Sequence, residues 1–472
     1  MIKLNVLTEN EIETIHASSL RILAETGVVL THPQGREMLV AAGGKVESDR
    51  VLLPAELVEE AVAHCPGEVR LRGRAGAVKV LGNDHLYWHN LGGARDVYEP
   101  RNGARRKASL QDLRDSTRLL DALDQVDSIT PLFTPQDVPG AIMSLAMYRH
   151  ALPHTTKILQ GPGVQSAAEV RYTARMATVV GPPAEILSLS ISPVSPLGFP
   201  DHAVEAIIET ARLNIAFAPL PCPTAGATAP LSIAGALAQQ NAEVLAAIVL
   251  AQLVQPGLPI VYCGRLAMME PRTGLSVWGG VELGLASAAT VQLGHRYGLP
   301  VNVYGFSTNS YTLDLQGGFE RGLNAAIPAL AGADELSGIG EMGAGVISSF
   351  AQIVCDNELA ASVRRLMRGF NADEDARGVD VIATVMRGTR NYLGQKHTLR
   401  YLRSGEVYMT RLAERGSWES WEASGRQGLT ERAQAEAERL LREHEIPPLS
   451  EDQERELDAI LDEARQVLSS GM

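Results

Sequence analysis

Five aromatic side chains are placed where they could bind a cation. Aromatic residues make up only 5% of the 472-residue chain, yet five of them stand at or just after short apolar segments that have the composition of strands. They are Trp88, Trp278, Tyr304, Phe306 and Tyr311. Because the face of an aromatic ring is electron-rich, a group of rings is the usual binding site for a quaternary ammonium. The alternative, that these rings fill the core or its rim, fits the sequence equally well.

Few residues that could transfer protons accompany these rings. Glu341 stands in a Gly-rich segment, where it is either a catalytic carboxylate or the partner of Arg364 or Arg365. The other candidates for the wall of a binding site are His89, Phe350 and His397. The chain contains no GxSxG or HExxH motif, and its four cysteines lie far apart without a CxxC spacing. We therefore expect neither a bound metal nor a disulfide framework.

The segment 215–264 predicts how such residues are positioned. An apolar strand runs into a loop of small residues, a long and almost uncharged helix follows, and a Gly-Leu-Pro stop leads into a second apolar strand. Strands this apolar are typical of a parallel sheet covered on both faces. In such folds the ligand binds at the carboxyl ends of the strands. The loop 222–230, which contains Cys222 and no charge, is therefore expected to face a ligand.

The same alternation recurs eight times after residue 86. Strands are expected at 87–92, 127–132, 156–160, 186–191, 215–220, 259–263, 301–305 and 334–339. Helices are expected at 109–125, 138–152, 166–179, 202–213, 232–255, 281–297, 317–331 and 356–370. Eight such units predict an α/β fold of the (β/α)8 TIM-barrel type. An open doubly wound sheet is the competing architecture, but no Gly cluster here forms a phosphate-binding loop at a helix start.

Two further regions flank the predicted barrel of residues 86–370. Residues 1–85 have the pattern of an N-terminal α+β cap, in which Thr8 and Glu11 can form a capping box. Residues 371–472 have the pattern of a C-terminal helical extension with two Glu/Arg-rich helices and sparse apolar positions. We expect this arm to cover the barrel or a neighbouring subunit, and the protein to be a homo-oligomer.

The composition excludes several classes of partner. The net charge of −13 argues against nucleic acid, because binding to phosphates requires clustered Lys and Arg. The one basic cluster, residues 101–107, is expected to be a solvated turn. The longest uninterrupted apolar runs are shorter than a membrane span, and the first residues lack the pattern of a signal peptide. We therefore expect a cytoplasmic enzyme.

Several long segments carry a family resemblance. They are residues 221–264, residues 317–331 with the strand before them, CDNELAASVRRLMRG at 355–369, GQKHTLRYLRS at 394–404 and WESWEASG at 418–425. Together they resemble the trimethylamine methyltransferase superfamily of corrinoid-dependent methyltransferases. The resemblance implies a TIM barrel that binds its substrate at the carboxyl-end mouth. It also implies a partner corrinoid protein that carries the cobalamin, so that no cofactor is bound covalently to this chain.

One departure from the family bears on the substrate. The founding trimethylamine enzyme uses pyrrolysine in the loop after the eighth strand, whereas the corresponding loop here, 340–348, reads GEMGAGVIS. Ala344 or Gly345 is expected at that position. The resemblance to members without pyrrolysine implies transfer of a methyl group from a small quaternary amine, glycine betaine or a related betaine, to Co(I) of the corrinoid protein.

A betaine carboxylate would require a cationic or N–H partner. The candidates are His89, Arg95, Arg265 and His397. Three alternatives stay open: a barrel that binds betaine without catalysis, a methyltransferase for another methylated amine, and a barrel lyase or hydrolase that uses Glu341.

Overall fold

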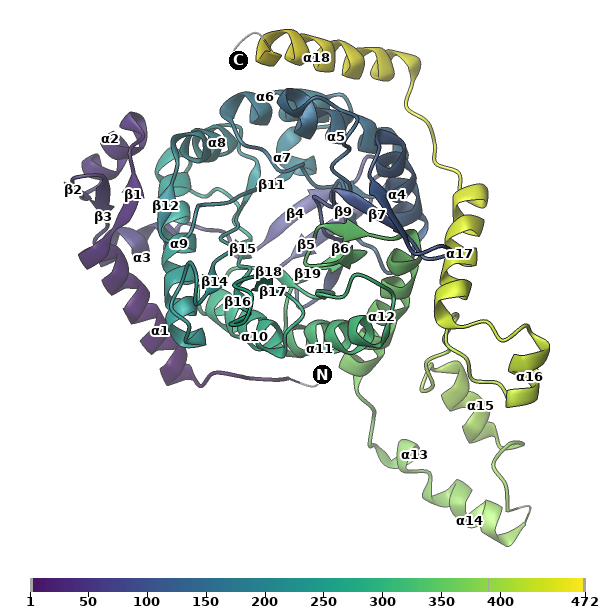
Figure 1. Ribbon diagram of the computed structural model, residues 1–472. Coiled ribbons are helices and arrows are strands. Elements are labelled where there is room, and N and C mark those ends of the chain that lie inside the picture. The colour runs from purple at the N-terminus through teal and green to yellow at the C-terminus, as the bar shows by residue number, and fades with distance from the viewer. Residues whose placement is uncertain (1–2, 389, 470–472) are drawn as a thin grey trace.

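The computed structural model describes residues 3–388 and 390–469, and its centre is a ring of parallel strands surrounded by helices (Figure 1). The strands of the ring are β6 (Tyr87–Asn90), β9 (Ser128–Ile129), β10 (Ile158–Leu159), β11 (Ser188–Ile191), β13 (Ala216–Pro219), β15 (Tyr262–Cys263), β18 (Val301–Tyr304) and β19 (Glu335–Ile339). The helices around it are α4 (Leu110–Ala122), α5 (Met143–Ala151), α6 (Ala167–Thr178), α8 (Asp201–Arg212), α9 (Ile233–Val254), α10 (Val281–Arg296), α11 (Leu315–Ala331) and α12 (Phe350–Arg368). Each predicted strand and helix is present, and the fold is the predicted (β/α)8 arrangement.

Hydrogen bonding between the strands is uneven around the ring. Six strands form one parallel sheet in the order β10-β9-β6-β19-β18-β15, so the last strand pairs with the first. β11 and β13 form a separate parallel pair. Single contacts connect this pair to the sheet: the Gly161 amide donates to the Ser188 carbonyl at 3.2 Å, and Phe217 bridges Ile260. The ladder is thus continuous on one side of the barrel and sparse on the other.

The N-terminal region packs against the barrel in two ways. Its helices are α1 (Glu9–Arg21), α2 (Pro33–Ala41) and α3 (Ala55–Ala63), and its strands β1 (Val28–Leu30), β2 (Lys45–Glu47) and β3 (Arg50–Leu52) form a sheet with β12 (Gly198–Phe199). Thr8 and Glu11 form the predicted capping box at the start of α1. The hairpin of β4 (Val69–Arg72) and β5 (Val78–Leu81) packs Val69 and Leu71 against Ile158 and Val261, near the amino ends of the barrel strands. This hairpin therefore fills the amino end of the barrel.

Helix α9 is a long and largely buried helix that covers the barrel. It has 22 residues and is apolar enough to cross a membrane by length and composition, but 83% of its most apolar window is buried inside the protein. The flanking helices α1, α3 and α8 pack against it. Its hydrophobicity is accounted for by burial between the N-terminal region and the barrel.

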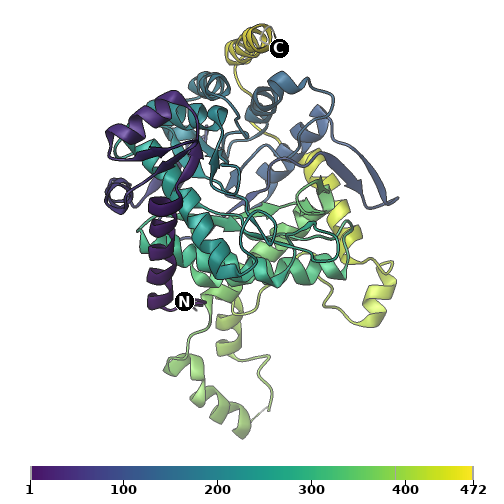
Figure 2. The same cartoon turned by 60° about the vertical axis from the view of Figure 1, so that its left-hand side comes forward.

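The C-terminal region divides into helices that cover the barrel and helices that project from it. α17 (Leu429–Glu443) packs on α12 and α4, and α18 (Glu451–Ser469) packs on α5 and α6. The other helices are α13 (Glu374–Arg377), α14 (Val379–Arg387), α15 (Lys396–Arg403) and α16 (Trp418–Ala423). Helices α13 and α14 extend away from the barrel in both views (Figures 1 and 2).

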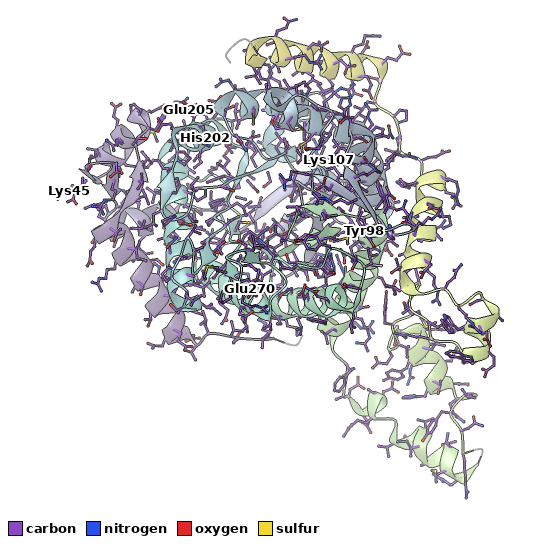
Figure 3. All side chains as sticks on the ribbon, viewed as in Figure 1. Lys45, Tyr98, Lys107, His202, Glu205 and Glu270 are labelled. Carbon is purple, nitrogen blue, oxygen red and sulfur yellow. The ribbon has the colours of Figure 1, made fainter. Side chains whose placement is uncertain are left out.

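The basic cluster at 101–107 is a β-hairpin rather than a turn, so that expectation was wrong for most of its residues. β8 (Ala104–Lys107) pairs with β7 (Asp96–Glu99), and Lys107 and Tyr98 mark this hairpin in Figure 3. Arg105 and Lys107 both form ion pairs with Asp96, which is buried. Asp96 stands directly opposite Lys107, and Glu99 forms an ion pair with Arg106 at 3.0 Å, so attraction between the two strands favours the extended conformation.

Short strands from the loops complete the carboxyl end of the barrel. β20 (Glu341–Met342) and β21 (Ile347–Ser348) form a hairpin that continues the β7–β8 sheet, and β14 (Thr224–Ala225), β16 (Ala267–Met269) and β17 (Ser276–Val277) form a second small sheet. α7 (Pro183–Ile186) precedes β11. The loops after β13, β15 and β19 are therefore ordered by pairing with one another or with β7.

Candidate active site

A cavity of about 680 Å³ opens at the carboxyl end of the barrel. Strand side chains alternate between the two faces of a sheet, so every second residue points into the barrel. The cavity is lined by such inward residues, among them His89, Ser188, Ser190, Asn302, Tyr304 and Ser337, and by loop residues after β10, β13 and β15, among them Gly161, Cys222 and Arg265. His202 of α8, labelled in Figure 3, also contributes to the wall. This is the end of a barrel where ligands are expected.

Asn302 organises the floor of the cavity. Its Nδ2 donates to His89 Nε2 at 2.9 Å and to Glu335 Oε2 at 2.6 Å, and its Oδ1 accepts from Arg265 Nη2 at 2.5 Å. His89 Nδ1 donates to the Asn90 carbonyl at 2.7 Å, which leaves Nε2 as an acceptor. Burial lowers the pKa of His89 to about 4. His89 is therefore neutral near pH 7, and its ring orientation is fixed at both nitrogens.

Glu335 and Lys79 form a buried ion pair under this floor. Lys79, from the hairpin that fills the barrel, places Nζ 2.5 Å from Glu335 Oε1. The same oxygen accepts from Gln160 Nε2 at 2.9 Å and Ser128 Oγ at 3.0 Å. Burial alone would raise the pKa of Glu335, but the charge of Lys79 and the hydrogen bonds from Lys79 and Asn302 together with the influence of His89 outweigh it and lower the pKa to about 2. Glu335 is thus an ionised, fully hydrogen-bonded structural carboxylate.

Arg265 lies on the cavity side of the same network. Its Nη1 donates to the Asn302 carbonyl at 2.9 Å, and its Nη2 donates to Ser337 Oγ at 3.0 Å. The guanidinium carbon stands 4.7 Å from the centre of the Tyr304 ring, a cation–π contact. Trp278 packs edge-on against the same ring at 5.2 Å. Burial raises the pKa of Tyr304 well above its usual value, so its phenol stays neutral.

Glu341 is a buried carboxyl close to the cavity, although it does not line it. Its Oε2 accepts from Ser307 Oγ at 2.8 Å, and no described residue hydrogen-bonds to Oε1. Burial raises its pKa to about 8, so it is mostly protonated near pH 7. The expected pairing with Arg364 or Arg365 was wrong, because Arg364 pairs with Asp127 and Arg365 pairs with Glu406.

The structure separates the five aromatic rings. Tyr304 lines the cavity, and Trp278 packs against it without lining the cavity itself. Trp88 and Phe306 pack on each other at 5.0 Å in the core and are fully buried. Tyr311 is 62% exposed. Trp88 cannot join His89 in the cavity, because neighbouring residues of a strand point to opposite faces. A single cage of five rings is therefore not formed.

Two further candidates also lie outside the cavity. Phe350 is the first residue of α12 and packs against Phe133 at 6.1 Å. His397 lies on α15 in the C-terminal extension, where its Nε2 contacts the Asp375 carbonyl at 3.1 Å. Of the four candidates for a carboxylate partner, His89 and Arg265 line the cavity, whereas Arg95 is exposed outside it.

The loop 340–348 is held in place by its backbone. The amides of Gly343 and Ala344 donate to the carbonyls of Ser310 and Thr308 at 2.8 and 2.9 Å. Ala344 has a φ of 59°, in the left-handed region that a residue with a Cβ rarely adopts. The loop after β19 is therefore attached to the loop after β18, beside Glu341.

Sequence reasoning missed the polar residues that face inward. Asn302 stands within the apolar run VNVY, Ser188 and Ser190 within SLSI, and Glu335 within ELSGI. The available signal was a polar residue at every second position of an otherwise apolar strand. No group of three or more His, Cys, Asp or Glu side chains in the described part of the chain is arranged to hold a metal ion.

The fold and the site together define a barrel enzyme with its cavity at the carboxyl ends of the strands, and a solved structure has the same fold. The crystal structure of the monomethylamine methyltransferase MtmB of Methanosarcina barkeri aligns with a TM-score of 0.50 over 98% of this chain and 92% of that chain, at 12% identity. At this identity the likeness concerns the fold alone.

Sequence comparison identifies the family. The model of the trimethylamine methyltransferase (MTTB) family matches residues 1–468. The chain is 31% identical to the trimethylamine methyltransferase MttB of Desulfitobacterium hafniense strain DCB-2, over 97% of this chain and 93% of that protein. It is 30% identical to the glycine betaine methyltransferase of D. hafniense strain Y51, over 97% of both. The chain belongs to the trimethylamine methyltransferase family and is a methyltransferase.

Proposed function

We propose that this methyltransferase moves a methyl group from a small quaternary amine, glycine betaine or a related betaine, to Co(I) of a partner corrinoid protein. One observation carries the choice of a quaternary amine. The loop 340–348 offers Ala344 and Gly345 where the family resemblance places pyrrolysine, so it has no side chain that could form an adduct with an amine. The relative named glycine betaine methyltransferase supports the same choice.

A quaternary nitrogen makes such an adduct unnecessary. When the methyl carbon is transferred, the electron pair of the broken C–N bond stays on nitrogen, and the product leaves as a neutral tertiary amine. No proton is transferred in this step. The corrinoid, carried by the partner, supplies the nucleophile that accepts the methyl group. The residues of this chain therefore act by positioning the substrate and excluding water.

The cavity is suited to these tasks. Tyr304 lines the cavity and Trp278 adds a second ring packed against it, and a trimethylammonium group binds favourably to aromatic surface. Glu341, protonated near pH 7, supports the adjoining loops through its contact with Ser307 rather than by accepting a proton. The opening at the carboxyl ends is the side from which a partner protein would approach. We also propose a cytoplasmic location and a homo-oligomeric state, neither of which enters the chemistry.

The test combines the purified protein with a reduced corrinoid protein and a panel of methylated amines. Formation of methyl-cobalt, followed by absorbance, is expected with at least one betaine and not with trimethylamine. Transfer from trimethylamine alone would contradict the proposal. Tight betaine binding without transfer in the presence of active corrinoid protein would instead identify a non-catalytic betaine-binding barrel.

Two tryptophan substitutions, one beside Tyr304 and one on the surface, test the role of aromatic surface in substrate binding. Trp278→Ala is expected to raise the KM for the betaine about fivefold or more, because it removes part of the aromatic surface. Trp418→Ala changes an exposed tryptophan of the C-terminal extension and is expected to leave the KM unchanged. Equal effects of the two substitutions would exclude a role of Trp278 in binding the ammonium group.

A further inference from the structure

The floor of the cavity carries one positive charge that no residue in the described part of the chain neutralises. Three charged side chains meet there: Lys79, Glu335 and Arg265. Lys79 and Glu335 form a pair at 2.5 Å and cancel each other. Within the described residues, no carboxylate lies within 4.0 Å of the Arg265 guanidinium, and its hydrogen bonds go to carbonyls, the Asn302 amide and the Ser337 hydroxyl. His89 adds no charge, because its Nε2 accepts a hydrogen bond from Asn302.

A buried cation of this kind requires a counter-charge. Arg265 is 6% exposed, and guanidinium groups at that depth are ordinarily paired with an anion, because their desolvation is costly. The neutral acceptors around Arg265 fix its position without neutralising it. Arg265 also lines the cavity, so a small anion could reach it from the open end. The missing counter-charge is therefore expected on a ligand.

Hydroxyl groups that line the same cavity also indicate an anionic ligand. Ser188 and Ser190 are inward positions of β11 and line the same cavity. Ser144, from α5, also lines it; it is 8% exposed, and its Oγ has no partner among the described residues. A carboxylate accepts several hydrogen bonds, whereas a quaternary ammonium group has no N–H to donate and accepts none. An unpartnered hydroxyl in the same cavity as a buried guanidinium thus matches an anionic oxygen group.

We propose that this floor is a carboxylate subsite, and that Arg265 selects N-methylated amines that bear a carboxylate. The inference rests on the proposed function and narrows its substrate class. The carboxylate would neutralise Arg265 and hold the ammonium group away from it, toward the open end of the cavity. Choline and tetramethylammonium lack a carboxylate and would bring a second, uncompensated cation into the same space. The subsite therefore excludes them by charge rather than by size.

Calorimetric binding to the full chain, without any corrinoid protein, tests the subsite. Glycine betaine is expected to bind at least about 10-fold more tightly than choline, since one charge-assisted contact accounts for such a ratio. Arg265→Gln is expected to reduce this preference to less than about threefold, and Arg265→Lys to retain part of it because it keeps the charge. Arg272→Gln is the matched control, because Arg272 is exposed and pairs only with Glu270.

A second measurement uses the unaltered protein, in case Arg265→Gln fails to fold. Acetate should compete with glycine betaine for the wild-type cavity, whereas tetramethylammonium at the same concentration should compete much less. Equal binding of choline and betaine to the wild type, or an unchanged preference in folded Arg265→Gln, would overturn the subsite. Betaine-selective binding without methyl transfer would uphold the subsite while contradicting the proposed function, so the two failures are distinguishable.

Discussion

Removal of Lys79 should destabilise the barrel from within. Lys79 and Glu335 are each 1% exposed, and their charged atoms lie 2.5 Å apart. Loss of one partner of a buried ion pair typically costs about 3–5 kcal/mol, because the remaining charge is left uncompensated. In Lys79→Met the Glu335 carboxylate keeps the hydrogen bonds from Ser128, Gln160 and Asn302. We therefore expect a loss near the lower limit, about 3 kcal/mol of unfolding free energy.

The loss of unfolding free energy in Lys79→Met should become smaller as the pH falls. In the wild type the pKa of Glu335 is lowered to about 2, so the stability that its ionised form contributes is present above the ordinary pKa of 4.5 and disappears only as the pH falls through about 2. Without Lys79, burial is opposed only by the remaining hydrogen bonds and by the influence of His89, and the pKa of Glu335 rises. The variant can then protonate Glu335 in mild acid, so its deficit should be smaller at pH 5 than at pH 8.

Urea denaturation followed by tryptophan fluorescence measures the effect, with the thermal midpoint as a second readout. Lys45→Met is the matched control: Lys45, labelled in Figure 3, pairs with Glu47 on the surface and should change stability by no more than about 0.5 kcal/mol. In Lys79→Met/Glu335→Gln the uncompensated charge is absent, so the double variant should be more stable than Lys79→Met. A cost below about 1 kcal/mol at pH 8, or equal deficits at pH 5 and pH 8, would refute the reasoning.

Three further outcomes are expected. The infrared band of a protonated carboxyl should persist to a pH of about 8, the raised pKa of the buried Glu341, and be absent in Glu341→Gln; loss of the band near pH 4.5 would contradict the burial of this group. Gly161→Ala should lower the free energy of unfolding by about 1–3 kcal/mol, because a Cβ there would lie 2.1 Å from a leucine methyl of β11. Gly163→Ala, whose Cβ would have nothing within 4 Å, should lower it by less than about 0.5 kcal/mol. Equal losses in denaturation experiments would contradict this packing. Arg149→Met should release α18 and speed its limited proteolysis roughly fivefold or more, because Arg149 pairs with two carboxylates of α18. Arg465→Met removes an ion pair within α18 and should not change the rate of proteolysis.

The sequence determined the order and position of the barrel elements. The strand expected at 301–305 is Val301–Tyr304, and the helix expected at 232–255 is Ile233–Val254. These predictions succeed because a buried strand and a core helix differ in the local spacing of their apolar residues, and because Gly, Pro and capping residues mark their ends. The hairpin at 96–107 was missed because its strands are short and β8 is exposed, with three basic residues out of four.

The tertiary structure decided which of these residues form the site. In β6, the residues Trp88 and His89 are neighbours in sequence, and either could have faced the cavity. Packing against the outer helices places the larger apolar ring in the core, and the two-residue periodicity of the strand then turns His89 inward. The same periodicity places Asn302 and Tyr304 on the inward face of β18, whereas Phe306 follows the end of the strand and packs on Trp88 in the core.

The sequence alone thus determined the family, the barrel and the end of the barrel at which the cavity opens, since each of these follows from local patterns along the chain. It left open the uncompensated charge of Arg265, which depends on residues from four different parts of the chain. Lys79 neutralises Glu335, Asn302 and Ser337 hold the guanidinium, and only closure of the barrel brings them together. Charge balance at a buried site is a property of three-dimensional neighbours, and no spacing in the sequence encodes it.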